Sequence, residues 1–338
     1  MTTETALNAA PPRRASPPRR ASHHGGVPIW QRLLIVILAT AGLSTVLYPS
    51  ASRWFTTRAN SADVTGYVEA AAGLPDQKKA ELLTQAKVYN ATLTGTGPIH
   101  DPYAGALGVE PDAAAPIVDQ YRKILAIDGT AAFGRLTIPS ISADLPIYHG
   151  TSTQALARGV GHLIGTALPI GGEGTHSVLT GHSGIVNATL FDNLHKVKLG
   201  DTFSISVLGM QLNYRVDQIL TVKPTDTAAL KVVKGQDLVT LVTCTPIGVN
   251  SHRLLVRGTR IPDDGPVTAD SGSPAVATLP GTGLSAGFPW WAIWFVVGMF
   301  AIFGITVKLG APARRRDDKV ADDDGEDGGL LSWPTWQD

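Results

Sequence analysis

The sequence predicts a mainly β domain that is held outside the cell between two membrane-spanning helices. Three observations support this prediction. Residues 129 to 261 show the apolar–polar alternation of short strands, a hydrophobic run lies on either side of them, and both ends of the chain are polar and low in apolar residues. The formal net charge of zero over 338 residues gives no reason to expect nucleic-acid binding.

Two hydrophobic segments are expected to anchor the chain in a membrane. Residues 29 to 48 carry one charge, Arg32, and residues 288 to 307 carry none and begin with a cluster of tryptophans. Each approaches the roughly 20 residues that cross a bilayer, and tryptophan is typical of the interface. A cleaved signal peptide is the alternative for the first segment, because small residues follow at 50 to 52, but the apolar run is long for one.

Positive charge sets the expected orientation. Four arginines precede the first segment within residues 1 to 28, and Lys308 and an arginine triplet follow the second. Because such charges favour the cytoplasmic side, residues 1 to 28 and 308 to 338 are predicted to be cytoplasmic tails, and the chain between the anchors is predicted to lie outside the cell membrane. The composition of both tails predicts disorder.

Residues 49 to 127 are predicted to form an extracytoplasmic helical region. Between residues 76 and 93, apolar residues recur on one side of a helix with Asp76 as its N-cap, so we expect an amphipathic helix next to the membrane. A second short helix is predicted from residue 116 to 125.

Residues 128 to 262 are predicted to be the β domain. Its clearest pattern is a hairpin in which residues 203 to 207 and 212 to 216 alternate around a turn at Gly209. The other expected elements are strands at 134–138, 145–149, 176–180, 219–223, 238–244 and 253–261, and helical turns after Thr151 and near 190–194. Many short strands separated by turns indicate a closed barrel or a sandwich. Residues 263 to 287 are rich in Pro, Gly and Ser and are predicted to be a linker.

The single cysteine, Cys244, excludes an intrachain disulfide and a Cys-rich zinc site. It ends a predicted strand in the stretch LVTCTP, where Pro246 stops the ladder, so its thiol could face a cleft at a sheet edge. A lone cysteine is more often a small buried apolar residue. It becomes a nucleophile only where a base or a cation favours the thiolate.

Two residues could activate such a thiol. His182 stands between two glycines in LTGHSG, directly after a predicted strand, and Arg253 opens the strand that follows Cys244. An arginine there would supply a permanent positive charge to a developing oxyanion. Taken singly, a solvated loop histidine and a surface ion pair are the simpler interpretations.

Together, the stretches TLVTCTP, LTGHSG and NSHRLLVRG resemble the signatures of sortases, the membrane-bound cysteine transpeptidases of Gram-positive bacteria. The resemblance covers residues 133 to 261, including LPIYHG and GVGHLIGTALPIGG. It implies an eight-stranded β-barrel with Cys244 as nucleophile, His182 as general acid/base and Arg253 as the substrate-positioning and oxyanion-stabilising residue. The implied chemistry needs no metal and no organic cofactor.

The stretch IHDPYAG refines the resemblance. By propensity it would be an ordinary turn, but upstream of such a barrel Asp101, Pro102 and Tyr103 look like the lid of class C sortases, the pilin polymerases. This resemblance implies that Asp101 pairs with Arg253 and that Tyr103 stacks over Cys244. Because a lid in the groove must open before a substrate enters, it would hold the free enzyme in a low-activity state.

The reaction implied by the resemblance cleaves a Leu-Pro-x-Thr-Gly sorting motif between Thr and Gly. The Cys244 thiolate attacks the Thr carbonyl, Arg253 steadies the oxyanion, and protonated His182 gives its proton to the departing Gly amine. A lysine amine of the next pilin subunit then resolves the thioacyl enzyme. The expected partners are therefore the sorting motifs of pilins or surface proteins, that lysine, and membrane lipid.

Other functions fit part of the pattern. A housekeeping sortase that attaches proteins to peptidoglycan would share the three residues, although the lid and the second anchor suit it less well. Papain-like or cell-wall-peptide cysteine hydrolases usually place Cys before His, the reverse of the order here. A third alternative is a non-enzymatic, cell-wall-anchored surface protein, because the linker itself carries a sorting pattern.

That pattern is made of five linker residues: Leu279, Pro280, Gly281, Thr282 and Gly283. The composition of the linker makes a chance match easy. Position favours a function, because an apolar span and a basic triplet follow, which is the order of a sorting signal. As a hypothesis, a sortase cuts this chain between Thr282 and Gly283 and so releases or re-anchors the domain.

Overall fold

The computed structural model describes residues 27–93, 101, 103, 115–186, 188–261 and 286–310. The expectations for Pro102, for the motif at 279–283 and for most of the two tails therefore lie outside the described residues. The chain divides into two compact units, of which residues 43–296 form one and the outer parts of the two apolar helices belong to the other. The unit of residues 43–296 contains every residue of the candidate site.

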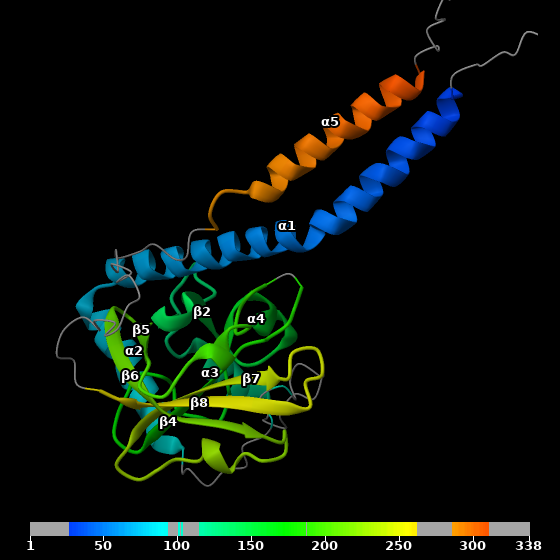
Figure 1. Ribbon diagram of the computed structural model, residues 1–338. Coiled ribbons are helices and arrows are strands. Elements are labelled where there is room, and N and C mark those ends of the chain that lie inside the picture. Colours follow the sequence, from blue (N-terminus) through cyan, green and yellow to red (C-terminus); the bar gives the residue numbers. More distant parts are fainter. Residues whose placement is uncertain are drawn as a thin grey trace, which may run out of the picture. The chain divides into compact units, whose positions relative to one another are not determined.

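Eight strands close into a barrel in the order β1-β2-β3-β4-β7-β8-β6-β5, which confirms the predicted fold class (Figure 1). The strands are β1 (Gly134–Ile138), β2 (Ala143–His149), β3 (Val160–His162), β4 (Thr175–Thr180), β5 (Thr202–Val207), β6 (Met210–Val222), β7 (Asp237–Thr245) and β8 (His252–Arg260). Neighbouring strands are antiparallel except for the β2–β3 and β4–β7 pairs, which are parallel. The parallel β4–β7 pair matters for function, because it brings the carboxyl ends of two strands to the same end of the barrel.

One strand prediction needs correction, and one strand was not predicted. Residues 212–216 and 219–223 were expected to be separate strands, but they belong to one strand, β6, whose register with β8 shifts between Val216 and Gln218. The intervening Asp217 points a carboxylate at Arg257 instead of continuing the alternation. The short β3 was not predicted, because three residues are too few to show a period and its parallel pairing with β2 needs no hairpin turn.

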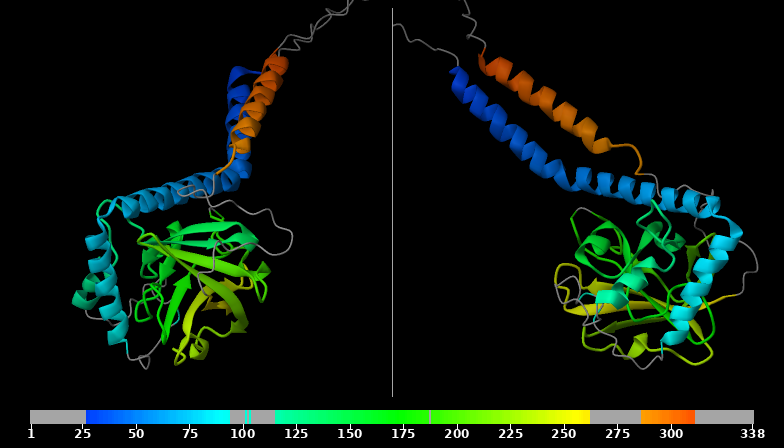
Figure 2. Two further views of the ribbon diagram at one scale, coloured as in Figure 1. Left: turned by 90° about the vertical axis from the view of Figure 1, so that its left-hand side faces the viewer. Right: turned by 180° about the vertical axis from the view of Figure 1, so that it is seen from behind.

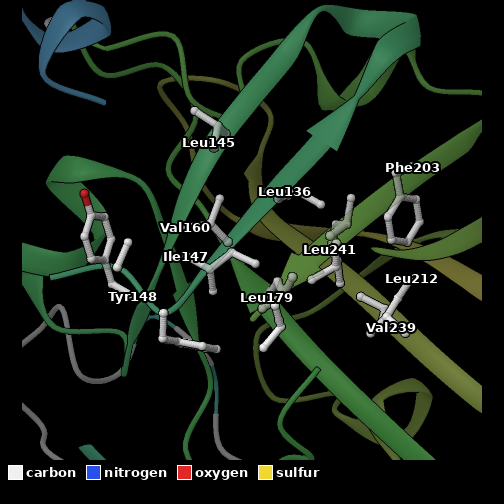
Figure 3. Close-up of a cluster of buried hydrophobic side chains, with 14 of the residues drawn as sticks. Leu136, Leu145, Ile147, Tyr148, Val160, Leu179, Phe203, Leu212, Val239 and Leu241 are labelled. Carbon is white, nitrogen blue, oxygen red and sulfur yellow. The ribbon is translucent and has the colours of Figure 1, made fainter. Parts of the chain in front are cut away.

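The barrel interior is a continuous apolar core to which opposite strands contribute (Figure 3). Leu179 of β4 and Leu241 of β7 are direct partners in the register, and both are fully buried. Phe203 and Tyr214 stack on one another with ring centroids 5.5 Å apart. This packing makes the barrel a solid support, so functional side chains must lie on its ends or outer face.

The first helix, α1 (Ile29–Gly73), is longer than the predicted anchor at 29–48. Its C-terminal part is amphipathic, with buried residues spaced by three or four positions: Asn60, Val64, Tyr67 and Ala71. The Tyr67 hydroxyl accepts a hydrogen bond of 2.8 Å from the backbone N–H of Leu208. Pro49 lies inside the helix, so a proline directly after the apolar run does not end it here.

The second helix, α2 (Asp76–Thr92), packs on the barrel, where Figure 2 shows it alongside the strands. Leu82 and Ala86 are buried in the barrel core. The Asn90 amide closes the contact, because it donates to the carbonyl of Leu168 at 3.1 Å and accepts from its N–H at 2.8 Å. Pro75 occupies the N-cap position that we predicted for Asp76, and no side chain caps this end.

The remaining helices are α3 (Ala115–Lys123), α4 (Thr153–Arg158) and α5 (Trp290–Gly310), with 3₁₀ turns at Pro139–Ile141, Leu194–Lys196 and Ala228–Leu230. Helices α1 and α5 are long and apolar enough to cross a membrane, judged by length and composition. Their outer parts contact one another within one unit, where the Thr40 hydroxyl lies 3.7 Å from the sulfur of Met299.

Candidate active site

Cys244 and Arg253 face each other across two antiparallel strands. Cys244 is the penultimate residue of β7, Arg253 is the second residue of β8, and the two are direct partners in the register. The loop between the strands begins at Pro246, which cannot donate to the ladder and so ends β7 at Thr245, one residue after the cysteine. Strand pairing therefore fixes the thiol and the guanidinium on the same end of the barrel.

His182 reaches the same end because β4 runs parallel to β7. Three hydrogen bonds tie its loop to β7: Gly181 N–H donates to the Val242 carbonyl at 3.1 Å, the Thr243 hydroxyl donates to the Gly181 carbonyl at 2.8 Å, and the Ser183 hydroxyl donates to the Cys244 carbonyl at 2.7 Å. A side chain at position 181 would collide with the ring of Phe191. The residues on either side of His182 are thus bonded to β7, which fixes the position of the histidine backbone.

Asp101 closes over Arg253. Its carboxylate accepts two hydrogen bonds from the guanidinium, 2.9 Å from Nε to Oδ1 and 2.7 Å from Nη2 to Oδ2. The arginine side chain is 10% exposed and the aspartate side chain 18%, so the pair is largely withdrawn from water. Such a bidentate pair is among the stronger ionic contacts, and removing one member leaves the other charge uncompensated.

Tyr103 covers the thiol and the histidine. Its ring centroid lies 5.5 Å from that of His182, and the guanidinium carbon of Arg253 lies 4.9 Å from the same ring centroid. The hydroxyl donates to the carbonyl of Gly181 at 2.6 Å, with that of Val242 at 3.4 Å. Tyr103 is 4% exposed and Cys244 is 9% exposed, so the tyrosine shields the sulfur from solvent.

An apolar cluster receives the Tyr103 ring. We call it the lid cluster; its members are Tyr103, Leu156, Leu163, Val178, Leu230, Val242, Cys244 and Leu255. It is separate from the barrel core and lies on the outer face of β4, β7 and β8. The Tyr103 ring is therefore packed among apolar side chains that lie beside the Cys244 thiol.

The electrostatics of this closed arrangement favour uncharged reacting groups. Burial raises the pKa of the Cys244 thiol, and the Asp101 carboxylate raises it further, while Arg253 and a hydrogen bond with Tyr103 act in the opposite direction. Burial lowers the pKa of His182. Burial also raises the pKa of Tyr103, which keeps its hydroxyl a proton donor. In this state, neutral thiol and neutral imidazole are the favoured forms.

A pocket borders Cys244 on another side. Cys244 is the only residue that it shares with the lid cluster. It is an open pocket of about 320 Å³ lined by Ser183, Phe191, Asp192, His195, Thr243, Cys244, Thr245, Pro246, Ile247 and Leu254. Asp192 is fixed at its rim, because its carboxylate accepts the N–H of Gly184 at 2.6 Å. The thiol thus lies between the covered lid cluster and an open pocket whose lining is mainly apolar.

The structure brings together all five described residues that the sequence singled out: Cys244, His182, Arg253, Asp101 and Tyr103. Sequence reasoning missed the hydroxyls of Thr243 and Ser183, which hold the histidine loop; both stand beside predicted site residues, and only the strand register shows what they bind. Within the described ranges, no group of three or more His, Cys, Asp or Glu side chains is placed to hold a metal ion.

Comparisons with known proteins agree on one family. Residues 136–261 match the model of the sortase domain. The structure is similar to that of sortase C-1 from Actinomyces oris, with 48% identity, a TM-score of 0.51 and coverage of 55% of this chain and 99% of that one. Sortase C1 of the GBS Pilus Island 1 is 42% identical, with a TM-score of 0.55 and coverage of 62% and 96%.

Curated relatives match over a shorter segment. Sortase D of Bacillus subtilis (strain 168) is 29% identical over 133 residues, which are 38% of this chain and 64% of that protein. Sortase A of Bacillus anthracis is 28% identical over 132 residues and is matched over 61% of its length. The chain thus spans less than two thirds of these two relatives, whereas it covers nearly all of the two sortase C structures. The protein belongs to the sortase family of cysteine transpeptidases, and its structural relatives place it in class C.

Proposed function

We propose that the protein is a membrane-anchored pilin polymerase. It would cleave an LPxTG-type sorting motif between Thr and Gly and join the acyl group to a lysine amine of a pilin subunit. The observation that carries this proposal is the closed lid, in which Tyr103 covers Cys244 while Asp101 holds Arg253. The origin of one similar structure, a sortase of a pilus island, supports the same assignment.

Lid opening would expose an apolar groove that suits the donor peptide. Its walls are the aliphatic members of the lid cluster, which match the leucine and proline of a sorting motif in chemistry. Tyr103 now occupies this space, so peptide binding and lid closure exclude one another. Opening would also return Arg253 to the site as a free cation, because its two strongest contacts are those to Asp101.

Acyl transfer then follows from the positions of the three residues. His182 takes the thiol proton, and the Cys244 sulfur forms a bond to the Thr carbonyl carbon. The oxyanion that results is adjacent to the permanent charge of Arg253. As the bond from the Thr carbonyl carbon to the Gly nitrogen breaks, the imidazolium returns its proton to the leaving amine, which leaves a thioester on the cysteine.

The acceptor would approach through the open pocket. This pocket shares only Cys244 with the lid cluster, so a donor peptide bound in place of the Tyr103 ring would leave the pocket open. A lysine side chain is long enough to bring its amine into a narrow space, and the Asp192 carboxylate offers an opposite charge at the rim. The amine attacks the thioester carbon, loses a proton to His182, and releases the thiol.

The sequence boundaries supply the proposed membrane arrangement. We assign residues 29–48 and 288–307 as membrane spans, residues 49–127 and the catalytic barrel at 128–262 to the outer side, and residues 263–287 to a linker. The tails, 1–28 and 308–338, are assigned to the cytoplasm because of their arginines and lysines.

The proposal is tested by intact-mass spectrometry of the full-length chain in detergent micelles, incubated with a peptide that contains Leu-Pro-Gly-Thr-Gly. The chain carrying Asp101→Ala and Tyr103→Ala should gain the mass of the acyl fragment, and adding Cys244→Ala should abolish the gain. A lysine peptide from a pilin should then discharge the adduct as an amide product. Absence of any adduct from the lid-open chain would contradict the proposal, and discharge by a peptidoglycan amine alone would indicate a housekeeping sortase.

A further inference from the structure

Strand β4 carries two buried hydroxyl groups that have no hydrogen-bond partner within the described residues. They are the hydroxyls of Ser177 and Thr180, whose residues are 2% and 0% exposed. Buried polar groups in folded proteins are almost always paired, so each exception needs a physical explanation.

The two hydroxyls lie on opposite faces of the strand. Ser177 is the register partner of Val239, which belongs to the barrel core, whereas Thr180 is the partner of Val242, which belongs to the lid cluster. Leu179, the neighbour of Thr180, packs in the core. Because side chains alternate along a strand, Thr180 must point to the opposite face. Thr180 therefore faces the groove that Tyr103 fills, and Ser177 faces the interior.

Neither described lid residue, Asp101 or Tyr103, hydrogen-bonds the Thr180 hydroxyl. The hydroxyl of Tyr103 gives its proton to the carbonyls of Gly181 and Val242. On the other side, the register partner of Thr180 is Gly161, which has no side chain. The rest of the lid cluster is apolar apart from the thiol, so none of its described members pairs with this hydroxyl, and a peptide that replaces the Tyr103 ring could supply the partner.

We propose that Thr180 is a polar anchor for the donor peptide. When Tyr103 leaves the groove, the Thr180 hydroxyl hydrogen-bonds a main-chain amide group of the bound sorting motif. This inference rests on the proposed function and names one residue of its donor site. A threonine hydroxyl can donate or accept, and an extended peptide between apolar walls leaves amide groups that need partners.

The chemistry of the position supports a functional hydroxyl. Valine has nearly the shape of threonine and would fill the same space without an unpaired polar group, so a folding requirement alone would favour valine in the closed state. A site built to hydrogen-bond its substrate, by contrast, discriminates strongly when that partner is missing. Threonine at position 180 therefore lowers the stability of the free chain and, under this proposal, improves recognition of the peptide.

The test uses the full-length chain in detergent with the lid opened by Asp101→Ala and Tyr103→Ala. Three further variants are compared in this parent: Thr180→Val, Thr180→Ser and, as matched control on the other face of β4, Ser177→Ala. The time course of acyl-enzyme formation with the Leu-Pro-Gly-Thr-Gly peptide gives kcat and KM for acylation. Thermal unfolding of the lid-closed chain with each β4 substitution reports its stability.

Thr180→Val should lower kcat/KM for acylation roughly two- to tenfold, the factor for one net hydrogen bond, with most of the change in KM. Thr180→Ser should stay close to the parent because it keeps the hydroxyl, and Ser177→Ala should acylate at the parent rate. The thermal midpoint of Thr180→Val should equal or exceed that of the unsubstituted chain. Peptides with a single amide replaced by an ester should include one that slows the parent but does not further slow Thr180→Val.

Acylation of Thr180→Val at the parent rate would overturn the inference, as would an equal loss in Ser177→Ala or a loss matched by a lower thermal midpoint. Failure of the lid-open parent itself to form an adduct is a separate outcome. It would contradict the proposed function, and the inference would be withdrawn with it.

Discussion

At the scale of single residues, Arg253 is shared between two arrangements. In the closed lid its guanidinium is bound by the Asp101 carboxylate and stacks on Tyr103, so its charge is neutralised beside the thiol. The same charge is the group that would stabilise an oxyanion at Cys244. Under the proposed function, Asp101 would therefore inhibit in two ways: it would hold the lid in place, and it would neutralise the cation that the reaction needs.

Replacing Asp101 with Asn should make Cys244 more reactive. The Asp101 charge contributes to the raised pKa of the thiol, and its loss also frees the lid, which reduces the burial that is the larger cause. The pH profile of alkylation by iodoacetamide should therefore shift to lower pH, and the rate at neutral pH should rise several-fold.

The matched control for this experiment is Asp217→Asn. Asp217 makes a similar bidentate pair with Arg257, four positions further along β8, with contacts of 3.1 and 2.8 Å. Its loss should leave the alkylation profile of Cys244 unchanged. An equal shift in both variants would show that altered net charge, rather than lid opening, controls the thiol.

Tyr103→Ala should raise the pKa of His182. Burial lowers this pKa in the closed state, and Tyr103 supplies part of that burial through the ring contact at 5.5 Å. With the ring removed, the imidazole should titrate closer to its ordinary value of about 6.5, so a larger fraction is protonated at any pH near neutrality. NMR titration of the histidine ring protons, assigned with His182→Gln, measures the change; an unaltered His182 titration would place the cause of its burial elsewhere.

The candidate residues could be predicted from sequence because their chemistry is local. Cys244, His182 and Arg253 stand in short stretches with distinct neighbours, and Asp101 and Tyr103 stand in one turn. Thr180 stands in the same stretch as His182, but the role of its hydroxyl could not be predicted, since it depends on the register partners Val242 and Gly161 and on the absence of a hydrogen-bond partner among the described residues. Pairing between distant strands is not visible in one sequence.

At the scale of secondary-structure elements, a buried histidine cluster attaches α3 to the barrel. Tyr121 of α3 places its hydroxyl 2.7 Å from Nδ1 of His162, and its ring makes an edge contact with His149 at 5.1 Å. His162 Nε2 lies 2.9 Å from the Ala167 carbonyl, and His149 Nε2 lies 2.7 Å from the Ile124 carbonyl. His162 is fully buried and His149 is half-buried, and the hydrogen bonds of both suit neutral rings.

This cluster should make the domain sensitive to acid. Burial lowers the pKa of His149 to about 4 and that of His162 to about 3. Below about pH 6.5 these histidines bind protons in the unfolded chain but not in the folded chain. The free energy of unfolding therefore falls with decreasing pH until the folded-state pKa values are reached. Each histidine contributes a slope of about 1.4 kcal/mol per pH unit in that window.

Far-UV circular dichroism melts of the full-length chain between pH 7 and pH 4 measure this effect. The thermal midpoint should fall as the pH is lowered. The midpoint of His149→Gln should fall less steeply, because one titrating group is lost. His195→Gln, at an exposed position, is the control and should follow the parent. Parallel curves for the parent and His149→Gln would contradict the role of this histidine.

The elements themselves were predictable wherever their pattern is contained in the sequence. The β5–β6 hairpin alternates visibly, and β1 was predicted with its observed limits, Gly134–Ile138. The continuation of α1 to Gly73 was not predicted, because its stability comes from burial of a face against the barrel rather than from a continuous apolar run. The partner surface, and not the helix sequence alone, determines where that helix ends.

At the scale of the whole molecule, the distribution of charge and apolar segments predicts a chain whose two ends share one side of a membrane and whose barrel lies on the other. Two helices have the required length and composition, and the basic residues lie at their outer ends in the sequence. This arrangement would confine the reactive thiol to the compartment in which sorting motifs and pilin lysines meet.

Cysteine labelling in intact cells tests this topology, because the chain contains a single native cysteine. In a Cys244→Ala background, one new cysteine is placed in the N-terminal tail (Ser16→Cys), on an exposed turn of the barrel (Thr225→Cys) or in the C-terminal tail (Ser332→Cys). A membrane-impermeant maleimide should label Thr225→Cys in intact cells, and both tail variants should be labelled only after permeabilisation, because arginines and lysines next to a span favour the cytoplasmic side. Labelling of Ser332→Cys in intact cells would contradict the assignment of the second span, and an intact mass lacking residue 16 would identify the first segment as a cleaved signal peptide. The labelling pattern of the three variants, together with the intact mass, thus distinguishes an enzyme held by two anchors from one held by its C-terminal helix alone.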